Sequence, residues 1–588
     1  MKRLFILIII LIIYPMTADV INPSIHQPSV PFYMETINFQ TIESAVFGDY
    51  AAGMLGDPYS DLSWNPAAIM NLKNTRMYLQ FNYEPGPDEQ SYYINPAYDN
   101  QYMSNIALNP SWINNSPIST INTTPIYHFA IISRLTENLS LGLINRSIFD
   151  YGPFRSANVY TGFRNEDALS WKYSEMELKA LEVDDNQQKV LGNQAEIYLG
   201  YNITEKLDLG LKLGHYICRR DGDLYDSEWS ENPHFDYADL NDEALNIDGH
   251  HLDLGIGLKY DLSEATRVGI YGGYMIGHSK DGRTMLDTTY SWSESAEEQK
   301  YYSIHKYNFS RDEDYTSDAT MPHLALHFET EISRDLLFRT YFKARWQKAD
   351  IEGDIYAFDT TFSDRTYDDY DNGSYHFRRR QIREATDFGL SGEGARNYSQ
   401  YKGFASLIFN PEDEWSIFGG LYFSYTSLEK DYTESSEYNF HGFTEYTKYE
   451  PGTIKILSDI DKDYAYTSEN INWNVIFPVG LKINVTKNLQ LLAGTDLQFQ
   501  IVDEQSRGDL VNPEKIYKKW ENGELVIDDQ EIERYERYSS DPSLDVTRDT
   551  NINFGAIYKQ PSGFRIYIGS GEEIFSTEGW SIGAEMIF

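Results

Sequence analysis

The sequence predicts an all-β protein, specifically a transmembrane antiparallel up-and-down β-barrel of 14 to 16 strands with a small N-terminal helical hatch in its lumen. Three observations predict this fold. Segments with apolar–polar alternation recur along most of the chain, the connections between them alternate between short and long, and the one long apolar run lies at the extreme N-terminus. They divide the chain into a signal peptide (residues 1–18), a hatch (19–74) and a barrel (75–588).

The first residues have the composition of a secretory signal peptide. Lys2 and Arg3 precede an unbroken apolar run over residues 4–13, and the small residue Ala18 follows at a suitable cleavage position. The run is much shorter than the roughly 20 residues of a membrane-spanning helix, which argues against an anchor. Because no other long apolar run occurs, a mature chain that spans a membrane must do so as a closed sheet, in which every backbone N–H and C=O is paired.

Period-two alternation defines the expected strands. In LDLGLKLGHY, which begins at Leu207, leucines occupy one face, whereas Asp208, Gly210, Lys212 and Gly214 occupy the other. One face suits hydrocarbon and the other suits water. The same pattern predicts sixteen strands, at residues 75–84, 125–134, 139–148, 193–203, 206–217, 249–261, 267–279, 322–332, 337–350, 400–410, 415–426, 473–484, 489–501, 550–558, 563–569 and 579–588.

The connections between these strands sort by length. Short turns are expected at 136–138, 204–206, 333–335, 411–413 and 486–488, and connections of some 30 to 50 residues lie between them. Short turns on one rim and long loops on the other are typical of outer-membrane barrels. A soluble β-sandwich is the alternative, but its turns would not sort by length in this way.

The charge of the chain has both a sign and a location. With 49 Lys and Arg against 90 Asp and Glu, the net charge of −41 excludes a nucleic-acid partner. Ten acidic residues fall between Cys218 and the end of the segment at Asp248, so long acidic extracellular loops are expected. Cys218 is the single cysteine, which rules out an intramolecular disulfide.

The C-terminal segment GWSIGAEMIF places Trp580 and Phe588 on the same face as three further apolar residues. A terminal Phe in this pattern resembles the signal that bacterial outer-membrane proteins present to the barrel-assembly machinery. The expected location is therefore the outer membrane of a Gram-negative cell, with its lipid, its lipopolysaccharide and the assembly machinery as partners.

A barrel of 14 to 16 strands encloses a lumen too wide for its own side chains to fill, so it conducts water or carries a plug. Residues 19–74 are the candidate plug. Residues 43–55 suit a short packed helix that ends at Gly56, and Asp57-Pro58 suits a turn. Pro66 suits the first turn of a second short helix.

Residues 51–72, AAGMLGDPYSDLSWNPAAIMNL, resemble the N-terminal hatch of the FadL/TodX superfamily of outer-membrane transporters. Trp64 within its WNPA form also makes the segment similar to the PorV branch of that superfamily. The resemblance implies fourteen strands rather than sixteen, and less acidic loops than these. It is carried by Gly53, Met54, Asp57, Ser60, Asn65, Pro66 and Ala67.

The resemblance implies a channel for the passive uptake of small hydrophobic compounds such as long-chain fatty acids, with no enzymatic activity and no cofactor. Two alternatives remain open. One is a PorV-like barrel that acts in protein secretion or surface attachment through its long loops. The other is a general porin. A continuous apolar tunnel past Trp64 favours transport, whereas a filled lumen and an exposed aromatic loop surface favour docking.

Two neighbouring predicted strands carry charges on the face expected to line the lumen. Their functional interpretation is a site that orients a carboxylate, but cross-strand pairing that solvates the wall is the favoured interpretation. The two histidines lie four residues apart, about 13 Å on a strand, which excludes a shared metal. The residues are His323, His327, Glu329 and Glu331 on the first strand and Arg339, Lys343 and Arg345 on the second. The sequence holds no G-x-S-x-G, Walker or zinc motif, so no catalytic or metal site is expected.

Overall fold

The computed structural model describes residues 41–47, 53–83, 119–120, 128–165, 177–232, 235–294, 302–371, 374–412, 414–447, 451–540, 543–570 and 580–588. The predicted signal peptide and residues 19–40 of the predicted hatch lie outside these described residues. Three short helical segments come first: α2 (Ile42–Val46), α3 (Pro58–Trp64) and the 3-10 helix η2 (Pro66–Asn71). No helix in the described ranges is long and apolar enough to cross a membrane.

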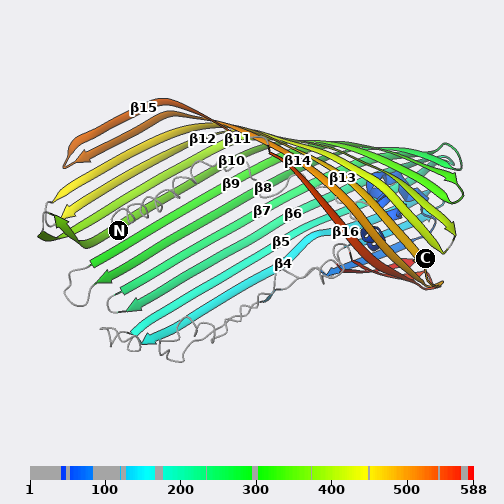
Figure 1. Ribbon diagram of the computed structural model, residues 1–588, viewed down its shortest axis with the longest axis horizontal. Helices are drawn as coiled ribbons and strands as arrows, with labels where there is room; N and C mark the ends of the chain where they lie inside the picture. The colour runs from blue at the N-terminus through cyan, green and yellow to red at the C-terminus, as the bar shows by residue number, and fades with distance from the viewer. Residues whose placement is uncertain are drawn as a thin grey trace.

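The remainder of the described chain is β-structure in one antiparallel sheet (Figure 1). The strands are β1 (Arg76–Tyr83), β2 (Ser119–Thr120), β3 (His128–Thr136), β4 (Leu139–Asn165), β5 (Glu177–Thr204), β6 (Leu207–Asn232), β7 (Phe235–Asp261), β8 (Thr266–Glu294), β9 (Tyr302–Ser333), β10 (Leu336–Asp371), β11 (Ser374–Glu412), β12 (Trp415–Thr447), β13 (Gly452–Asn484), β14 (Leu489–Glu521), β15 (Glu524–Ser539), β16 (Ser543–Lys559), β17 (Phe564–Ser570) and β18 (Trp580–Ile587).

Sixteen of the 18 described strands close into a ring. The other two, β2 and β15, each pair along one side only, with β4 and β14, and are not needed to close it. The ring closes where β1 pairs with β18 on one side and with β3 on the other. Every predicted strand overlaps one ring strand, which confirms the all-β barrel and the count of sixteen. The fourteen strands implied by the family resemblance are wrong for this chain.

The long acidic loops predicted between strands are also wrong. Most of those residues continue the strands, so that β10 has 36 residues and ends at Asp371, and β11 has 39 residues and begins at Ser374. The prediction failed because hydropathy alternation fades there, although backbone pairing does not. An inward apolar cluster of Tyr315, Ile351, Ile355 and Leu390 still supports this region, and cross-strand ion pairs such as Arg283–Glu243 offset part of the acidity.

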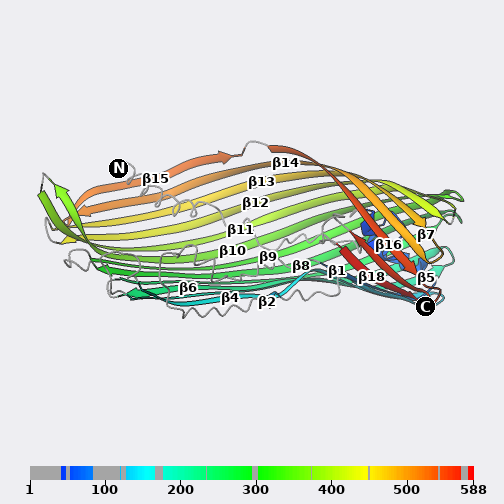
Figure 2. The same cartoon turned by 60° about the horizontal axis from the view of Figure 1, so that its bottom comes forward.

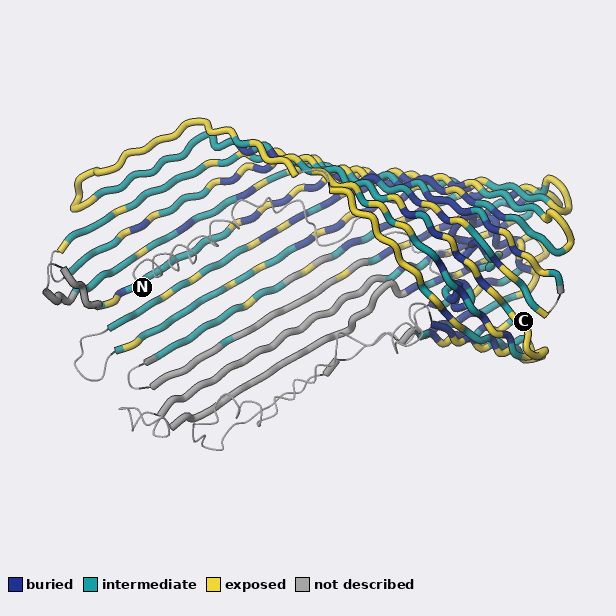
Figure 3. The backbone as a smooth tube through the Cα atoms, in the orientation of Figure 1, coloured by how far each residue is buried: buried dark blue, intermediate teal, exposed yellow. Residues whose placement is uncertain are grey.

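The ring is closed at one end only. Since β1, β3, β17 and β18 are short, the distal parts of the long strands continue as a curved sheet beyond the closed ring (Figures 1 and 2). At about 3.3 Å per residue, β11 alone is on the order of 130 Å long. Most buried residues lie in the closed end (Figure 3), which is where the helical segments lie. The closed end is therefore the part of the molecule that can hold a site inside a barrel.

We expect the acidic segments to resist proteolysis. Glu228 on β6 and Glu243 on β7 are each paired with strands on both sides, which protects the backbone from a protease that needs an extended, free substrate. Digestion of the folded protein with a Glu-specific protease should spare both positions and cut first at Glu137 and Glu205 in the short turns, as peptide mapping would show. Rapid cleavage at Glu228 and Glu243 would instead indicate the loops that the sequence predicted.

Candidate functional site

The candidate site is the hatch (residues 41–72 as described) together with the inner wall that surrounds it. Local sequence builds its helices. The Thr41 hydroxyl accepts a hydrogen bond from the Ser44 N–H at the start of α2, and the Asp57 carboxylate accepts one from the Tyr59 N–H, 2.9 Å away, at the start of α3. Asp57-Pro58 thus begins a helix with proline in its first turn, rather than the predicted turn.

Asn65 joins the last two helical segments. It ends α3, and its side-chain oxygen accepts a hydrogen bond of 2.9 Å from the Ala67 N–H at the start of η2. Its side-chain amide donates to the backbone carbonyl of Leu258 on the wall, 3.0 Å away. Pro66 begins the predicted second short helix, which has 3-10 geometry. The Asn-Pro-Ala triplet therefore shapes the hatch and attaches it to β7 at the same point.

Inward-facing glycines form the seat of η2. A Cβ added at Gly210 on β6 would overlap the Ala67 backbone nitrogen and lie 2.6 Å from the Ala67 Cα, and one added at Gly257 on β7 would lie 2.9 Å from the Pro66 ring. Gly200 and Gly269 on the flanking strands approach η2 and Asn65 equally closely. Real Cβ atoms do not occupy such positions, so η2 packs closely on β5, β6 and β7, and Asn65, which precedes it, packs on β8.

A second set of inward glycines seats α2 on the other side of the barrel. A Cβ at Gly494 would lie 2.7 Å from the Phe47 Cα, and one at Gly555 would lie 2.8 Å from the Val46 side chain. Gly480, Gly569 and Gly583 make comparable approaches to residues 42–47. The two seats hold the hatch from two sides of the closed ring. These glycine seats were not predicted from the sequence. The glycines that alternate with leucines along a strand were interpreted only as residues that face water.

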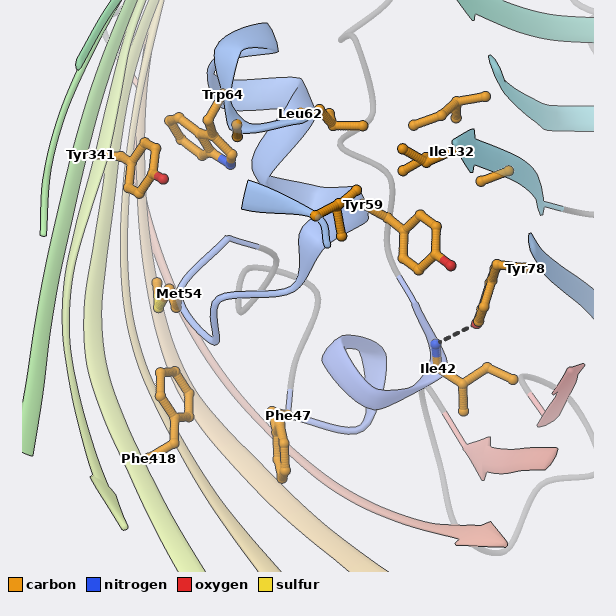
Figure 4. Close-up of a cluster of buried hydrophobic side chains, with 14 of the residues drawn as sticks. Ile42, Phe47, Met54, Tyr59, Leu62, Trp64, Tyr78, Ile132, Tyr341 and Phe418 are labelled. Carbon is orange, nitrogen blue, oxygen red and sulfur yellow. Dashed lines mark hydrogen bonds between the residues drawn. The ribbon is translucent and has the colours of Figure 1, made fainter. Parts of the chain in front are cut away.

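The centre of the hatch forms one apolar core with the wall (Figure 4). The Trp64 ring lies 5.3 Å from the rings of both Tyr341 and Phe404, in an edge-on arrangement to Phe404, and is 1% exposed. Met54 is fully buried, and its carbonyl accepts a hydrogen bond of 3.0 Å from Ser406. The indole N–H of Trp64 has no hydrogen-bond partner among the described residues.

The two remaining predicted hatch residues, Gly53 and Ser60, also lie in the packed interior. Gly53 adopts a φ of +86° and supports the indole of Trp64 from one side, since a Cβ there would lie 2.7 Å from the indole nitrogen. Ser60 is fully buried within α3. With Met54, Asp57, Trp64, Asn65, Pro66 and Ala67, the structure places all eight predicted hatch residues inside the ring.

Arg339 is the main charged link between wall and hatch. One guanidinium nitrogen lies 2.9 Å from both carboxylate oxygens of Asp61 on α3, and Nε lies 2.8 Å from Glu329 on the adjacent strand. All three groups are largely removed from water, so the guanidinium is neutralised by one partner from the wall and one from the hatch. Arg339 and Glu329 were predicted from the sequence as charges that face the lumen. Asp61, which lies 278 residues from Arg339 along the chain, was not.

The other residues predicted to place charge in the lumen fall into two groups. One lies near the Arg339–Asp61 pair at the hatch, and the rest lie on the wall away from the hatch. His327 lies 3.4 Å from the Asn65 amide and stacks on Tyr341, so it belongs with the hatch. His323 contacts Tyr271, 2.9 Å away, and the Lys343 ammonium lies 5.8 Å from the centre of that same ring. Arg345 donates to Gln400. Glu331 is exposed near the rim and stands apart from this group.

A buried ionic network on strands β4 to β7, which adjoins His323 through Asp253, was not predicted. Glu196 on β5 lies 2.7 Å from both Arg146 and Lys212, and Lys212 also lies 2.9 Å from Asp253. The side chains of all four are at most 3% exposed, and the Tyr198 hydroxyl adds a hydrogen bond to Glu196. Two cations balance two carboxylates, so the network stiffens the inner wall with little net charge.

The predicted assembly residues lie at the C-terminal edge. Trp580 pairs with Tyr83 at one end of β18. The Phe588 side chain is exposed, and its backbone N–H donates to the carbonyl of Thr75, 2.9 Å away. No group of three or more His, Cys, Asp or Glu residues suited to a metal occurs in the described parts of the chain.

Comparison with known proteins found solved structures with a similar arrangement but no match to the sequence. No protein-family model and no curated protein matches the sequence. Solved structures with a similar arrangement include the CymD monoaromatic hydrocarbon channel (12% identity, TM-score 0.22, covering 70% of this chain and 98% of that one). The toluene transporter TbuX of Ralstonia pickettii has 11% identity and a TM-score of 0.28, covering 76% and 98%. A Pseudomonas aeruginosa FadL homologue has 9% identity and a TM-score of 0.30, covering 93% and 98%. Scores of this size carry no argument about this chain, whose fold rests on its own strand pairing.

Substitution at the glycine seat should displace the hatch. We expect Gly210→Val to force η2 away from β6, at a cost of about 1 to 3 kcal/mol in the stability of the docked hatch. Proteolysis of residues 41–72 in the folded barrel would measure it. The matched control is Gly272→Val, because Gly272 shares a face with outward Ile270 and Tyr274 and has no atom closer than 3.9 Å to an added Cβ. Equal protease resistance in both variants would contradict the seat.

Docking of the hatch should weaken as pH rises through the acidic range. Burial raises the pKa of Asp57 from 3.8 to about 7 and that of Asp61 to about 6, even with Arg339 beside it. A raised carboxyl pKa means that the docked state binds more protons than the released one, so its stability is highest below about pH 4 and falls until about pH 7. Proteolysis of the hatch at pH 4 to 8 would test this, and Asp57→Asn, which keeps the cap, should flatten the profile. A rising profile would contradict it.

Proposed function

We propose that this chain is a Gram-negative outer-membrane barrel that admits small hydrophobic compounds, such as long-chain fatty acids, by passive passage controlled by its hatch. One observation carries the proposal. The segment that resembles the FadL/TodX hatch lies inside the closed ring, seated on wall glycines and continuous with an apolar core. A segment built this closely into a barrel wall is suited to closing a lumen.

The outer surface of the closed end supports a membrane location. On β7, Leu254 and Ile256 face outward and are 52% and 54% exposed. Asp253, which precedes Leu254, faces inward and is buried. Similar outward leucines and isoleucines occur on the other ring strands. Lipid would cover this surface, and closure of the ring leaves no unpaired edge within it. The short turns then lie on the periplasmic rim, and the long strands extend from the cell surface into the lipopolysaccharide.

The filled lumen bears on the choice between a general porin and a selective channel. A porin needs an aqueous path, yet the hatch and wall share a core of buried residues that includes Trp64, Met54 and Phe418. Water-soluble compounds would have to displace this apolar core. A hydrophobic compound could instead replace one apolar contact by another, so the core favours an apolar ligand over a polar one.

A second candidate function is docking of secreted or surface-attached proteins, as in PorV-like barrels. Two observations favour it. The lumen around Trp64 is filled by a packed core. The distal sheet is also long, since a bilayer needs only about 9 to 11 residues per strand and β11 has 39. The distal residues exceed what a channel through the membrane requires. They would present a large paired surface outside the cell.

Ligand retention distinguishes these functions. We expect protein purified in mild detergent to carry an apolar small molecule, detected by native mass spectrometry and by extraction. Asn65→Ala with Pro66→Ala should lose it, because Asn65 fixes both the start of η2 and its attachment to Leu258. Gly272→Val on the outer surface is the control that should retain it.

The outcomes separate the candidates. Absence of any co-purified apolar compound from the intact chain, combined with capture of a surface protein, would replace transport by docking. Rapid swelling of proteoliposomes in a small sugar with the intact chain would indicate a general porin.

A further inference from the structure

The seam of the closed ring is defined here as the pairing of the first strand β1 with the last strand β18, and it lies in the most briefly paired part of the ring. It runs only from Arg76 opposite Ile587 to Tyr83 opposite Trp580. The pairing of β10 with β11, in contrast, continues from Leu336 opposite Phe409 to Asp371 opposite Ser374. The strands that flank the seam, β3 and β17, are short as well. Backbone pairing alone therefore supports the seam and its neighbours, β1 with β3 and β16 with β17, much less than it supports the wall from β4 to β14.

The hatch contacts both strands of the seam from inside. On the β1 side, the backbone N–H of Ile42 donates to the Tyr78 hydroxyl, 3.0 Å away (Figure 4), and the Tyr59 ring lies 5.3 Å from the Tyr78 ring. On the β18 side, the Ile42 side chain packs on the backbone of Gly583, where a Cβ would lie 2.9 Å from it. The start of α2 thus spans the joint between the first and last strands.

Glu585 on β18 collects the polar contacts of this joint. Its carboxylate accepts hydrogen bonds from the hydroxyls of Tyr59 on the hatch (3.1 Å) and Tyr567 on β17 (2.7 Å). It also pairs with Arg76 on β1 at 3.3 Å and with Arg565 on β17 at 3.2 Å. The carboxylate is 2% exposed, so these four groups supply its solvation. One buried side chain therefore links the hatch, the first strand and the last two strands.

We propose that the hatch holds the barrel seam closed, with Glu585 and Tyr59 as the residues that couple hatch docking to the pairing of β1 with β18. Release of the hatch removes the Ile42 and Tyr59 contacts and leaves the Glu585 carboxylate with fewer donors in a buried position. The seam then opens more often than it does when the hatch is docked. The coupling is independent of what the barrel carries, because every contact in it lies within the chain.

Hydrogen–deuterium exchange of the purified, detergent-solubilised full chain tests this coupling. We expect Tyr59→Phe and Glu585→Gln each to speed exchange of β1 (76–83) and β18 (580–587) amides on the order of tenfold, the effect of losing a hydrogen bond to a buried charge. Exchange in the paired β12 and β13 should not change. Gly272→Val is the matched control, since Gly272 lies on the outer face of β8 and touches neither the hatch nor a seam strand.

Two results would overturn the proposal. In one, both Tyr59→Phe and Glu585→Gln leave seam exchange at the wild-type rate in a folded barrel. In the other, Gly272→Val speeds seam exchange as much as they do, which would show general loosening of the barrel rather than coupling through the hatch. Tyr59→Phe preserves the ring packing on Tyr78, so it keeps the test available if Glu585→Gln does not fold. Ligand retention is measured separately, and its failure leaves the exchange result unaffected.

Discussion

The structure of the closed end depends on close approach between two backbones. At Gly210, Gly257 and Gly494 the wall has no Cβ, and the hatch backbone or its proline ring occupies the space that a side chain would need. Dispersion forces act over short distances, so this approach makes hatch and wall one packed core rather than a plug in a pipe. The hatch accordingly has an apolar interior that its three short helices could not form alone.

Polar groups inside this core are tolerated because each main charge has partners nearby. Arg339 is neutralised by Asp61 and Glu329, and Glu196 by Arg146 and Lys212. An unpaired charge at these depths would cost several kcal/mol, which disfavours other positions of the hatch. The charges thus fix where the hatch docks, while the apolar contacts supply most of its affinity. Both features suit a barrel that is closed at rest and opens only for a ligand that competes for apolar contacts.

The long distal strands set this chain apart from a barrel cut to the thickness of a membrane. Their inner face keeps an apolar cluster around Ile351 and Ile355, and cross-strand pairs such as Arg379 with Asp364 join neighbouring strands. In the described part of the chain, much of the negative charge is consequently carried by paired strands, which hold it in a fixed pattern. A fixed charged surface is suited to selecting what approaches the barrel.

The sequence by itself determined the strands of the ring, their number and the short helix that begins at Pro66, because alternation and capping are local properties. It did not determine where the strands end, since distal pairing persists after the hydropathy signal fades. Nor did it determine the site. Asp61 meets Arg339 and Tyr59 meets Glu585 across 278 and 526 residues, and these meetings follow from ring closure, which no local pattern encodes. The role of Gly210 likewise appears only when η2 lies against it. Tertiary structure decided these features because a close approach depends on both surfaces, and the sequence shows each surface separately.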